Sequence, residues 1–434
     1  MIAQNLHRLK VERSALHLTS FAGLPLLSEL AHQVGLIDRL DAIPGLWERG
    51  GLYKTSDYVM GLALSLIAGG EGLDDTRLLR SDPGLGQLVF PNMPAANSLG
   101  RFLRRFDQRS IYRLGETVTE QALKNLGAYK TLTLDVDSTL IESEKEEAKK
   151  TYKGFEGYNP LLAWLAEPDV FIAGVFREGN ASPQSHLLPL LKYCHRHLPR
   201  DVKLRLRSDS AGYRLDLIGY CQQNGIPFAI GADLDAAVME AIDHIPKKDW
   251  RLVVRGTDVF LLAETIHVPG GSTSGTHLSA CRLIVTQRVN AQLELFEPAI
   301  RYRAILSDLD ASWTTEQVMD YYNARGSAEK AIGELKNGFG LHKLPCGQLF
   351  ANAAFFQIGL LAYNLVQTFK HFALPEGWKT FCIKNLRFRL LCQAAIVVRH
   401  ARRIVLKLSA AFPNFSVFES ARWAVLSPEV AYPA

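Results

Sequence analysis

The residues best suited to do chemistry together lie on one face of a predicted helix over residues 315–337. At about 100° per residue, three polar side chains fall within about 60° of one another around Glu329; they are Tyr322, Arg325 and Lys336. The other acids of this helix point about 140–180° away from that face. The periodicity therefore selects Glu329 as the acid of this helix that can join a site.

Two further acids end predicted strands. Asp137 ends the alternating segment 131–137 and is followed by Ser138 and Thr139, while Asp209 follows the alternating segment 202–208. We expect these segments, the first and fourth predicted strands, to be neighbours in one sheet, so that their carboxylates meet at one edge. Asp135 shares the face of Asp137, about 6.5–7 Å away along the strand. On geometry alone Asp135 competes for the same role.

Three converging carboxylates repel one another unless a cation balances them. Oxygen ligands left partly open to water and substrate suit Mg²⁺ or Mn²⁺. Two such ions, about 3.5–4 Å apart, can activate a nucleophile and stabilise a leaving oxygen in in-line phosphoryl transfer. The alternative is a plain i,i+4 ion pair between Arg325 and Glu329, worth a few tenths of a kcal/mol.

The elements that must position these residues predict an α/β protein. From residue 131 the expected order is β-β-β-α-β-α-β, then an all-β insertion of about eighty residues, then the helix with Glu329. Apart from the insertion, this is the order of a ribonuclease-H-like catalytic domain, and helical N- and C-terminal regions are expected to flank it. The predicted boundaries are a helical N-terminal DNA-binding domain over 1–128, the first part of the catalytic core over 129–231, a β-rich insertion over 232–310, the final catalytic helix over 311–345, and a helical C-terminal region with DNA or dimer contacts over 346–434.

Basic residues are concentrated in two segments, although the net charge is only +5. Residues 101–114 hold five arginines against one acid, and residues 379–407 hold eight Lys and Arg with no acid. A one-signed stripe of this density is typical of a nucleic-acid contact, and the alternative is a solvated helix face. The candidate DNA contacts are Arg101, Arg104, Arg105, Arg399, Arg402 and Arg403.

Several other classes of protein lack their usual signals. The first residues show no basic-then-apolar signal peptide, and the apolar stretch 351–369 is interrupted by polar residues, so a cytoplasmic protein without a membrane span is expected. The six cysteines include no C-x-x-C pair, and no P-loop, G-x-G-x-x-G or H-E-x-x-H motif is present.

The spacing Y-x2-R-x3-E-x6-K, formed by Tyr322, Arg325, Glu329 and Lys336, resembles the signature of DDE transposases from bacterial insertion sequences. The segments LDVDST at 134–139, REGN at 177–180 and RSDSAGY at 207–213 also resemble motifs of these enzymes. The best match is the insertion-sequence family numbered thirteen-eighty, related to the IS-four group, over essentially the whole chain.

This resemblance implies that Asp137, Asp209 and Glu329 bind two Mg²⁺ or Mn²⁺ ions, with Asp137 favoured over Asp135. It implies that Tyr322, Arg325 and Lys336 contact DNA near the cleaved phosphate. The implied activity is that of a transposase that binds terminal inverted repeats, cleaves the element ends and joins their 3′-OH groups to target DNA. A homodimer in a synaptic complex, associated with the bacterial nucleoid, is the implied assembly. The alternatives are a ribonuclease-H-like nuclease or resolvase without strand transfer, and a domesticated DNA-binding protein.

Overall fold

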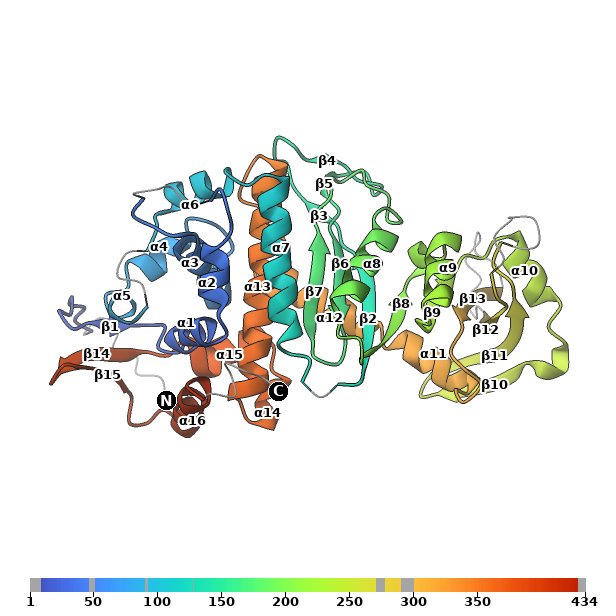
Figure 1. Ribbon diagram of the computed structural model, residues 1–434. Coiled ribbons are helices and arrows are strands. Elements are labelled where there is room, and N and C mark those ends of the chain that lie inside the picture. The colour runs from blue at the N-terminus through green and yellow to red at the C-terminus, as the bar shows by residue number, and fades with distance from the viewer. Residues whose placement is uncertain are drawn as a thin grey trace.

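A mixed sheet of nine strands runs from the middle of the protein to one end, as seen in the computed structural model (Figure 1). The described residues are 9–46, 51–89, 93–127, 129–270, 278–289 and 300–427. The strand order is β10-β11-β12-β13-β9-β8-β2-β6-β7. The strands are β2 (Thr131–Ser138), β6 (Leu161–Leu165), β7 (Val170–Val175), β8 (Lys203–Ser208), β9 (Phe228–Ala232), β10 (Arg251–Arg255), β11 (Asp258–His267), β12 (Cys281–Val289) and β13 (Ile300–Ser307).

Strands β7, β6, β2, β8 and β9 form the part of the sheet that holds the first two aspartates. β2 runs antiparallel to β6 and parallel to β8, and β8 runs parallel to β9. In chain order this is 3-2-1-4-5, the arrangement expected for a ribonuclease-H-like core. The predicted adjacency of the strands ending near Asp137 and Asp209 is therefore present.

The alternation of β2 separates an apolar face from a functional face. Leu132, Leu134 and Val136 are buried in a core that also includes residues of three helices. These helices are α8 (Leu187–His197), α9 (Leu215–Gln223) and α10 (Ala236–Asp243). Because side chains alternate along a strand, Asp135 and Asp137 point to the other face.

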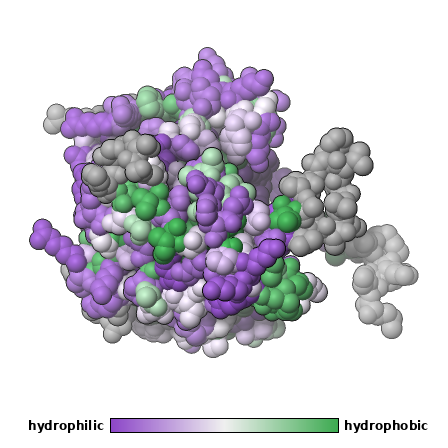
Figure 2. Space-filling view, turned by 90° about the vertical axis from the view of Figure 1, so that its right-hand side faces the viewer, coloured by the Kyte–Doolittle hydropathy of each residue, from purple (hydrophilic) through white to green (hydrophobic). Residues whose placement is uncertain are grey.

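The insertion extends this same sheet, because β13 pairs antiparallel with β9 and β10–β13 form a meander. The expectation of an all-β insertion was wrong in one respect, since α10 lies within it. Asp235 caps that helix by accepting from the backbone N–H of Val238 at 2.8 Å. Viewed from the insertion end, apolar patches lie among hydrophilic side chains (Figure 2). Exposed apolar residues of the insertion include Leu252, Val254, Val259 and Ile266.

Helix α13 (Leu349–Ala373) stands beside α7 (Gln108–Leu123), between the terminal regions and the sheet (Figure 1). Its length and composition would let it cross a membrane, but 89% of its most apolar window is buried. Its polar side chains form hydrogen bonds with backbone groups at the outer edge of β7. Asn364 accepts from the N–H of Phe171 and donates to its carbonyl, and Gln357 donates to the Gly174 carbonyl at 2.7 Å. The polar residues that interrupt this stretch in the sequence thus seal the edge of the sheet.

The N- and C-terminal regions share one hydrophobic core, which includes residues of α1, α3, α13 and α16. The N-terminal elements are β1 (Leu18–Thr19), α1 (Leu24–Gln33), α2 (Leu36–Asp41), α3 (Thr55–Ala68), α4 (Thr76–Arg80), α5 (Leu85–Leu88) and α6 (Ala96–Leu103). The C-terminal elements after α13 are α14 (Glu376–Lys379), α15 (Ile383–Leu386), a π-helical turn (Arg387–Leu391), β14 (Ala395–His400), β15 (Arg403–Leu408) and α16 (Phe415–Val425).

The expectation that the C-terminal region is helical was wrong for residues 395–408. They form a hairpin whose first strand also pairs with β1. The β-branched runs at 396–398 and 404–405 favour strands. Ala401 and Arg402 form the two-residue turn with φ of 48° and 64°, the positive values typical of tight hairpins. A further small sheet consists of β3 (Ile141–Glu142), β5 (Glu156–Tyr158) and β4 (Lys149–Lys150).

Candidate active site

The helix predicted over residues 315–337 is divided into α11 (Thr315–Asn323) and α12 (Gly326–Gly338). Its start is as expected, since Thr314 and Gln317 form a capping box. The break is a tight turn, in which the N–H groups of Arg325 and Ser327 bond carbonyls three residues back. Gly326 at the turn is a poor helix former. Tyr322 therefore belongs to one helix, and Arg325 stands at the entrance of the next.

Arg325 joins two of the three predicted carboxylates. Its Nη1 lies 3.0 Å from Asp137 Oδ2, and its Nη2 lies 2.8 Å from Glu329 Oε1. The side chains of Arg325 and Asp137 are each 16% exposed, whereas that of Glu329 is 56% exposed. The i,i+4 ion pair considered from the sequence is thus present, and it extends across to the end of β2.

Asp209 comes to the same edge through the parallel pairing of β2 and β8. Val136 lies opposite Ser208 in that register, so Asp137 and Asp209 are the next residues of the two strands. The Asp209 carboxylate accepts from the N–H of Ala211 at 3.1 Å and caps the short 3₁₀ turn Ser210–Gly212.

The electrostatics of Asp137 reflect this gathering of acids. Burial raises the pKa of Asp137 to about 6, Arg325 lowers it, and the nearby Asp209 and Glu329 raise it. The carboxyl of Asp137 is therefore a group whose ionised form would gain from a further cation.

Asp135, the competitor on the same strand, has a partner of its own. Arg207 Nε and Nη2 bond its two carboxylate oxygens at 2.8 and 2.5 Å, and both side chains are at most 4% exposed. Burial raises the pKa of Asp135 to about 6, against the lowering effect of Arg207. Arg207 also donates to the Tyr321 carbonyl at 2.9 Å and lies over the Tyr321 ring. Asp135 thus forms a closed ion pair that ties β2 to the end of α11.

Sequence reasoning missed Arg207, although a signal for it exists. Arg207 stands two residues before Asp209, as Asp135 stands two residues before Asp137. In adjacent parallel strands this equal offset places Arg207 opposite Asp135.

Lys336 and Tyr322 differ in how far they reach solvent. Lys336 is half-buried and donates to the Leu140 carbonyl at 2.8 Å, which ties α12 to the segment after β2. Burial lowers the pKa of Lys336, and Lys153 lowers it further. Tyr322 is only 4% exposed and packs with Val318 and Met319 against the insertion. In this conformation the Tyr322 ring supports the helix from within the core.

Arg177 of the REGN segment is a buried residue that sequence reasoning gave no role. It is 4% exposed and donates to the carbonyls of Asn159 at 2.7 Å and Ser185 at 2.5 Å. Burial lowers its pKa to about 10. Arg177 therefore orders the loop between β7 and α8.

The candidate DNA contacts away from this site are mostly exposed. Arg101 and Arg104 are exposed at the end of α6, whereas Arg105 is partly buried and donates to the Leu46 carbonyl at 3.5 Å. We call Arg399, Arg402 and Arg403 the hairpin arginines; all three are exposed on the β14–β15 hairpin.

The basic stripe of residues 379–407 does not form one surface. Arg387 from this stripe donates to the carbonyls of Ile67 and Leu66, at the end of α3, and of Gly338, at the end of α12. It is a helix-capping residue inside the protein rather than a candidate DNA contact.

The donor set of the three predicted ligands is chemically suited to Mg²⁺ or Mn²⁺, since all are carboxylates. Among the described residues, no three His, Cys, Asp or Glu side chains are gathered around a common metal position. The guanidinium of Arg325 lies between Asp137 and Glu329 and balances part of their charge. A metal ion joining these two acids requires the Arg325 side chain to move.

Asp137 and Asp209 thus lie at the ends of two adjacent parallel strands, and Arg325 links Glu329 of α12 to the same edge of the sheet. The chain belongs to the transposase DDE domain group 1 family, whose model matches residues 3–427. DDE transposase domains generally use divalent metal ions. The comparison with curated proteins gives no match.

Among solved structures, the chain is similar to a piggyBac transposase determined as a synaptic complex with hairpin DNA. The sequence identity is 14% and the TM-score is 0.44, over 84% of this chain and 78% of that one.

Proposed function

We propose that this transposase binds the terminal inverted repeats of an insertion sequence of the family numbered thirteen-eighty, cleaves the element ends and joins their 3′-OH groups to target DNA. The observation that carries the proposal is the edge of the sheet where Asp137 and Asp209 end adjacent parallel strands and Glu329 is linked to Asp137 through Arg325.

Asp137, Asp209 and Glu329 are the proposed metal ligands. Two Mg²⁺ or Mn²⁺ ions would supply activation of the attacking oxygen and stabilisation of the leaving oxygen. The chain itself supplies a buried carboxylate at Asp137, whose raised pKa favours a cation beside it. Glu329 is exposed enough to turn toward that cation.

Arg325 and Lys336 are the proposed contacts to DNA phosphates near the cut. Arg325 is balanced by Asp137 and Glu329 in the free protein, and its fork geometry equally suits a phosphate. Lys336 holds the Leu140 carbonyl, and its ammonium can bind a phosphate as a point charge. The proposed role of Tyr322 is indirect, because its ring is buried beneath Arg303.

The hairpin arginines, with Arg101, Arg104 and Arg105, are proposed to contact the DNA backbone away from the cut. Transposition joins two element ends, so we propose that two copies of the chain act together in a synaptic complex. Its place of action would be the cytoplasm, at the nucleoid.

The test is incubation of the purified protein with end-containing DNA and Mg²⁺, followed by analysis of nicked and joined products. The variants Asp137→Asn, Asp209→Asn and Glu329→Gln should each abolish cleavage and joining while end binding is kept, because each removes a ligand charge at nearly constant volume. Glu240→Gln, on the exposed face of α10, is the matched control and should cleave normally.

The products also separate the alternatives. A nuclease or resolvase would give specific cuts without joined products, and a domesticated DNA-binding protein would bind ends without cutting. Cleavage that survives any of the three substitutions contradicts the assignment of that ligand.

A further inference from the structure

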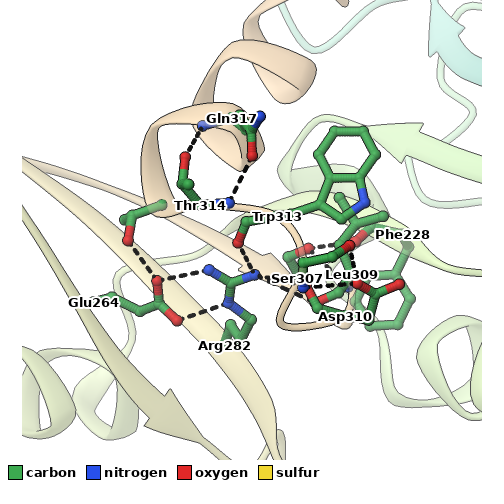
Figure 3. A network of polar contacts seen from close by, with 11 residues as sticks. Phe228, Glu264, Arg282, Ser307, Leu309, Asp310, Trp313, Thr314 and Gln317 are labelled. Carbon is green, nitrogen blue, oxygen red and sulfur yellow. Dashed lines mark hydrogen bonds and ion pairs between the residues drawn. The ribbon is translucent and has the colours of Figure 1, made fainter.

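The insertion holds the start of α11 through a partly buried ion pair. Arg282 of β12 bonds both carboxylate oxygens of Glu264 of β11, at 2.7 and 2.8 Å. The other terminal nitrogen of this guanidinium, Nη1, donates to the carbonyl of Trp313 at 2.8 Å and to that of Asp310 at 3.2 Å. Figure 3 shows this guanidinium pointing into the loop that leads from β13 to α11.

Glu264 completes the attachment by bonding the helix itself. The hydroxyl of Thr315, the first residue of α11, donates to Glu264 Oε2 at 2.7 Å. Burial raises the pKa of Glu264, but the bonds from Arg282 and Thr315 outweigh it and leave the pKa lowered. Arg282 is 16% exposed and Glu264 27% exposed, so this pair is partly shielded from solvent. We call Glu264 and Arg282 the helix clamp.

The rest of α11 is also attached to the insertion. On its outer face, Glu316 lies 3.1 Å from Arg251, and Asp320 pairs with both terminal nitrogens of Arg255. These are two of the acids that the helical periodicity places away from Glu329. At the end of the helix, Arg303 of β13 lies over the Tyr322 ring, 5.0 Å from its centroid.

Helix α12 is attached to different parts of the protein. Arg325 at its entrance bonds Asp137, and Lys336 bonds the Leu140 carbonyl, both next to β2. Glu334 accepts from the Ile383 N–H at 2.6 Å, and Ile332 lies in the core shared with α13. The tight turn at 324–325 therefore lies between two helices with different attachments. The insertion holds the start and outer face of α11, and Arg207 of β8 bonds its end. The catalytic core and the C-terminal region hold α12.

We propose that the insertion sets the position of Arg325 and Glu329 against Asp137 by holding α11, with the helix clamp as a pair of positioning residues. A shift of the insertion would be passed through α11 to the turn at 324–325. Arg207 bonds both Asp135 of β2 and the Tyr321 carbonyl of α11, so it connects the end of the moving helix to the catalytic core. The inference rests on the proposed function for its activity readout.

The first test compares Arg282→Gln with Arg288→Gln in the full-length protein. Arg288 is on the same strand and pairs with Asp258 at 3.0 Å, with both side chains more than half exposed and no bond to α11. Both variants lose one positive charge, so nonspecific effects on DNA binding should match. We expect Arg282→Gln to slow end cleavage about 10- to 100-fold, the loss typical of a small misplacement of catalytic groups. Arg288→Gln should stay within about twofold of the unmodified protein.

Hydrogen exchange provides a readout that does not depend on activity. In Arg282→Gln the amides of α11 should exchange faster, with those of β2 and β8 unchanged, and Arg288→Gln should alter neither. Arg282→Lys, which keeps the charge but loses the fork, should recover only part of the cleavage rate. Equal cleavage by Arg282→Gln and Arg288→Gln, or unchanged exchange in α11, overturns the proposal.

A second set of variants serves if Arg282→Gln fails to fold. Arg255 and Asp320 form an exposed pair, so Arg255→Asp and Asp320→Arg should each fold yet loosen α11. The double variant reverses the pair and should restore both the exchange rate of α11 and the cleavage rate. Failure of the reversed pair to restore either one contradicts the proposal. Absence of cleavage by the unmodified protein would instead contradict the proposed function, and the exchange results would still decide the attachment of α11.

Discussion

Replacing Asp137 by Asn should remove activity and stabilise the metal-free protein, by more at pH 7.5 than at pH 4.5. Burial, together with Asp209 and Glu329, raises the pKa of Asp137 from 3.8 to about 6, even with Arg325 in contact. The native state therefore keeps its proton on Asp137 in a pH range where the unfolded chain has lost it. Stability from this group falls as the pH rises through that range and levels off above it.

The size of the effect follows from the two pKa values. The ionised carboxylate lowers the free energy of unfolding by about 1 kcal/mol at pH 4.5 and by about 3 kcal/mol at pH 7.5. Asn resembles the protonated carboxyl in shape and has no charge, so Asp137→Asn should remove this penalty. The variant should gain about 1 kcal/mol at the lower pH and about 3 kcal/mol at the higher one.

The assay is thermal unfolding of both proteins in a chelator at pH 4.5 and 7.5. Asp216→Asn is the matched control, because the hydrogen bond from Arg214 lowers the pKa of Asp216 and its exposed ion pair favours the ionised form. That control should show no gain at pH 7.5. A Tm difference for Asp137→Asn that is equal at the two pH values, or a loss at pH 7.5, would refute the reasoning.

Three further substitutions test the neighbouring residues. Asp135→Asn should slow cleavage less than Asp137→Asn does, because Asp135 is sealed in its pair with Arg207 and is not a proposed metal ligand; loss of cleavage in Asp135→Asn with cleavage kept in Asp137→Asn would contradict the choice of Asp137 as the ligand. Lys336→Ala should weaken assembly with end DNA and slow cleavage but leave Mn²⁺ binding to the free protein nearly unchanged, and calorimetric titration with Mn²⁺ tests this. Replacing the hairpin arginines by Gln should weaken binding to any DNA. Each lost phosphate contact should reduce the slope of the logarithm of the binding constant against the logarithm of salt concentration by about 0.9. An unchanged slope would mean that these arginines make no phosphate contact.

The features that could be predicted from the sequence are those that local periodicity records. Alternation along residues 131–137 places Asp137 opposite the apolar face, and the capping box at Thr314 and Gln317 fixes the start of α11. The meeting of Asp137 with Asp209 needed one further assumption, the strand order of a ribonuclease-H-like sheet, which the pairing of β2 with β8 satisfies.

The features that could not be predicted depend on contacts between distant segments. The ion pair of Arg207 with Asp135 joins residues 72 positions apart, and the helix clamp joins two strands to a helix beyond them. The break between α11 and α12 at 324–325 could not be predicted from the periodicity, because one tight turn barely changes the spacing of the apolar positions around the helix axis. The hairpin at 395–408 was not predicted, because its basic residues were interpreted as a charged stripe and the short β-branched runs between them were given no weight.

Charge counts also cannot distinguish a basic residue that binds a partner from one that completes the fold. Arg387 and the hairpin arginines belong to the same acid-free stripe, yet Arg387 caps two helices inside the protein and the others are exposed. The same distinction separates the two aspartates of β2. Asp135 and Arg207 form a pair that is closed to solvent, so neither can take a new partner without breaking the core.

Asp137 is balanced differently, through an arginine that it shares with an exposed glutamate. Arg325 divides its two bonds between Asp137 and Glu329, and Glu329 is more than half exposed. Under the proposed function, a cation would take the place of Arg325 at these carboxylates, and a DNA phosphate would receive the guanidinium. The two aspartates of β2 thus differ in how their charges are balanced: Asp135 forms a sealed pair with Arg207, whereas Asp137 shares Arg325 with a glutamate that reaches solvent.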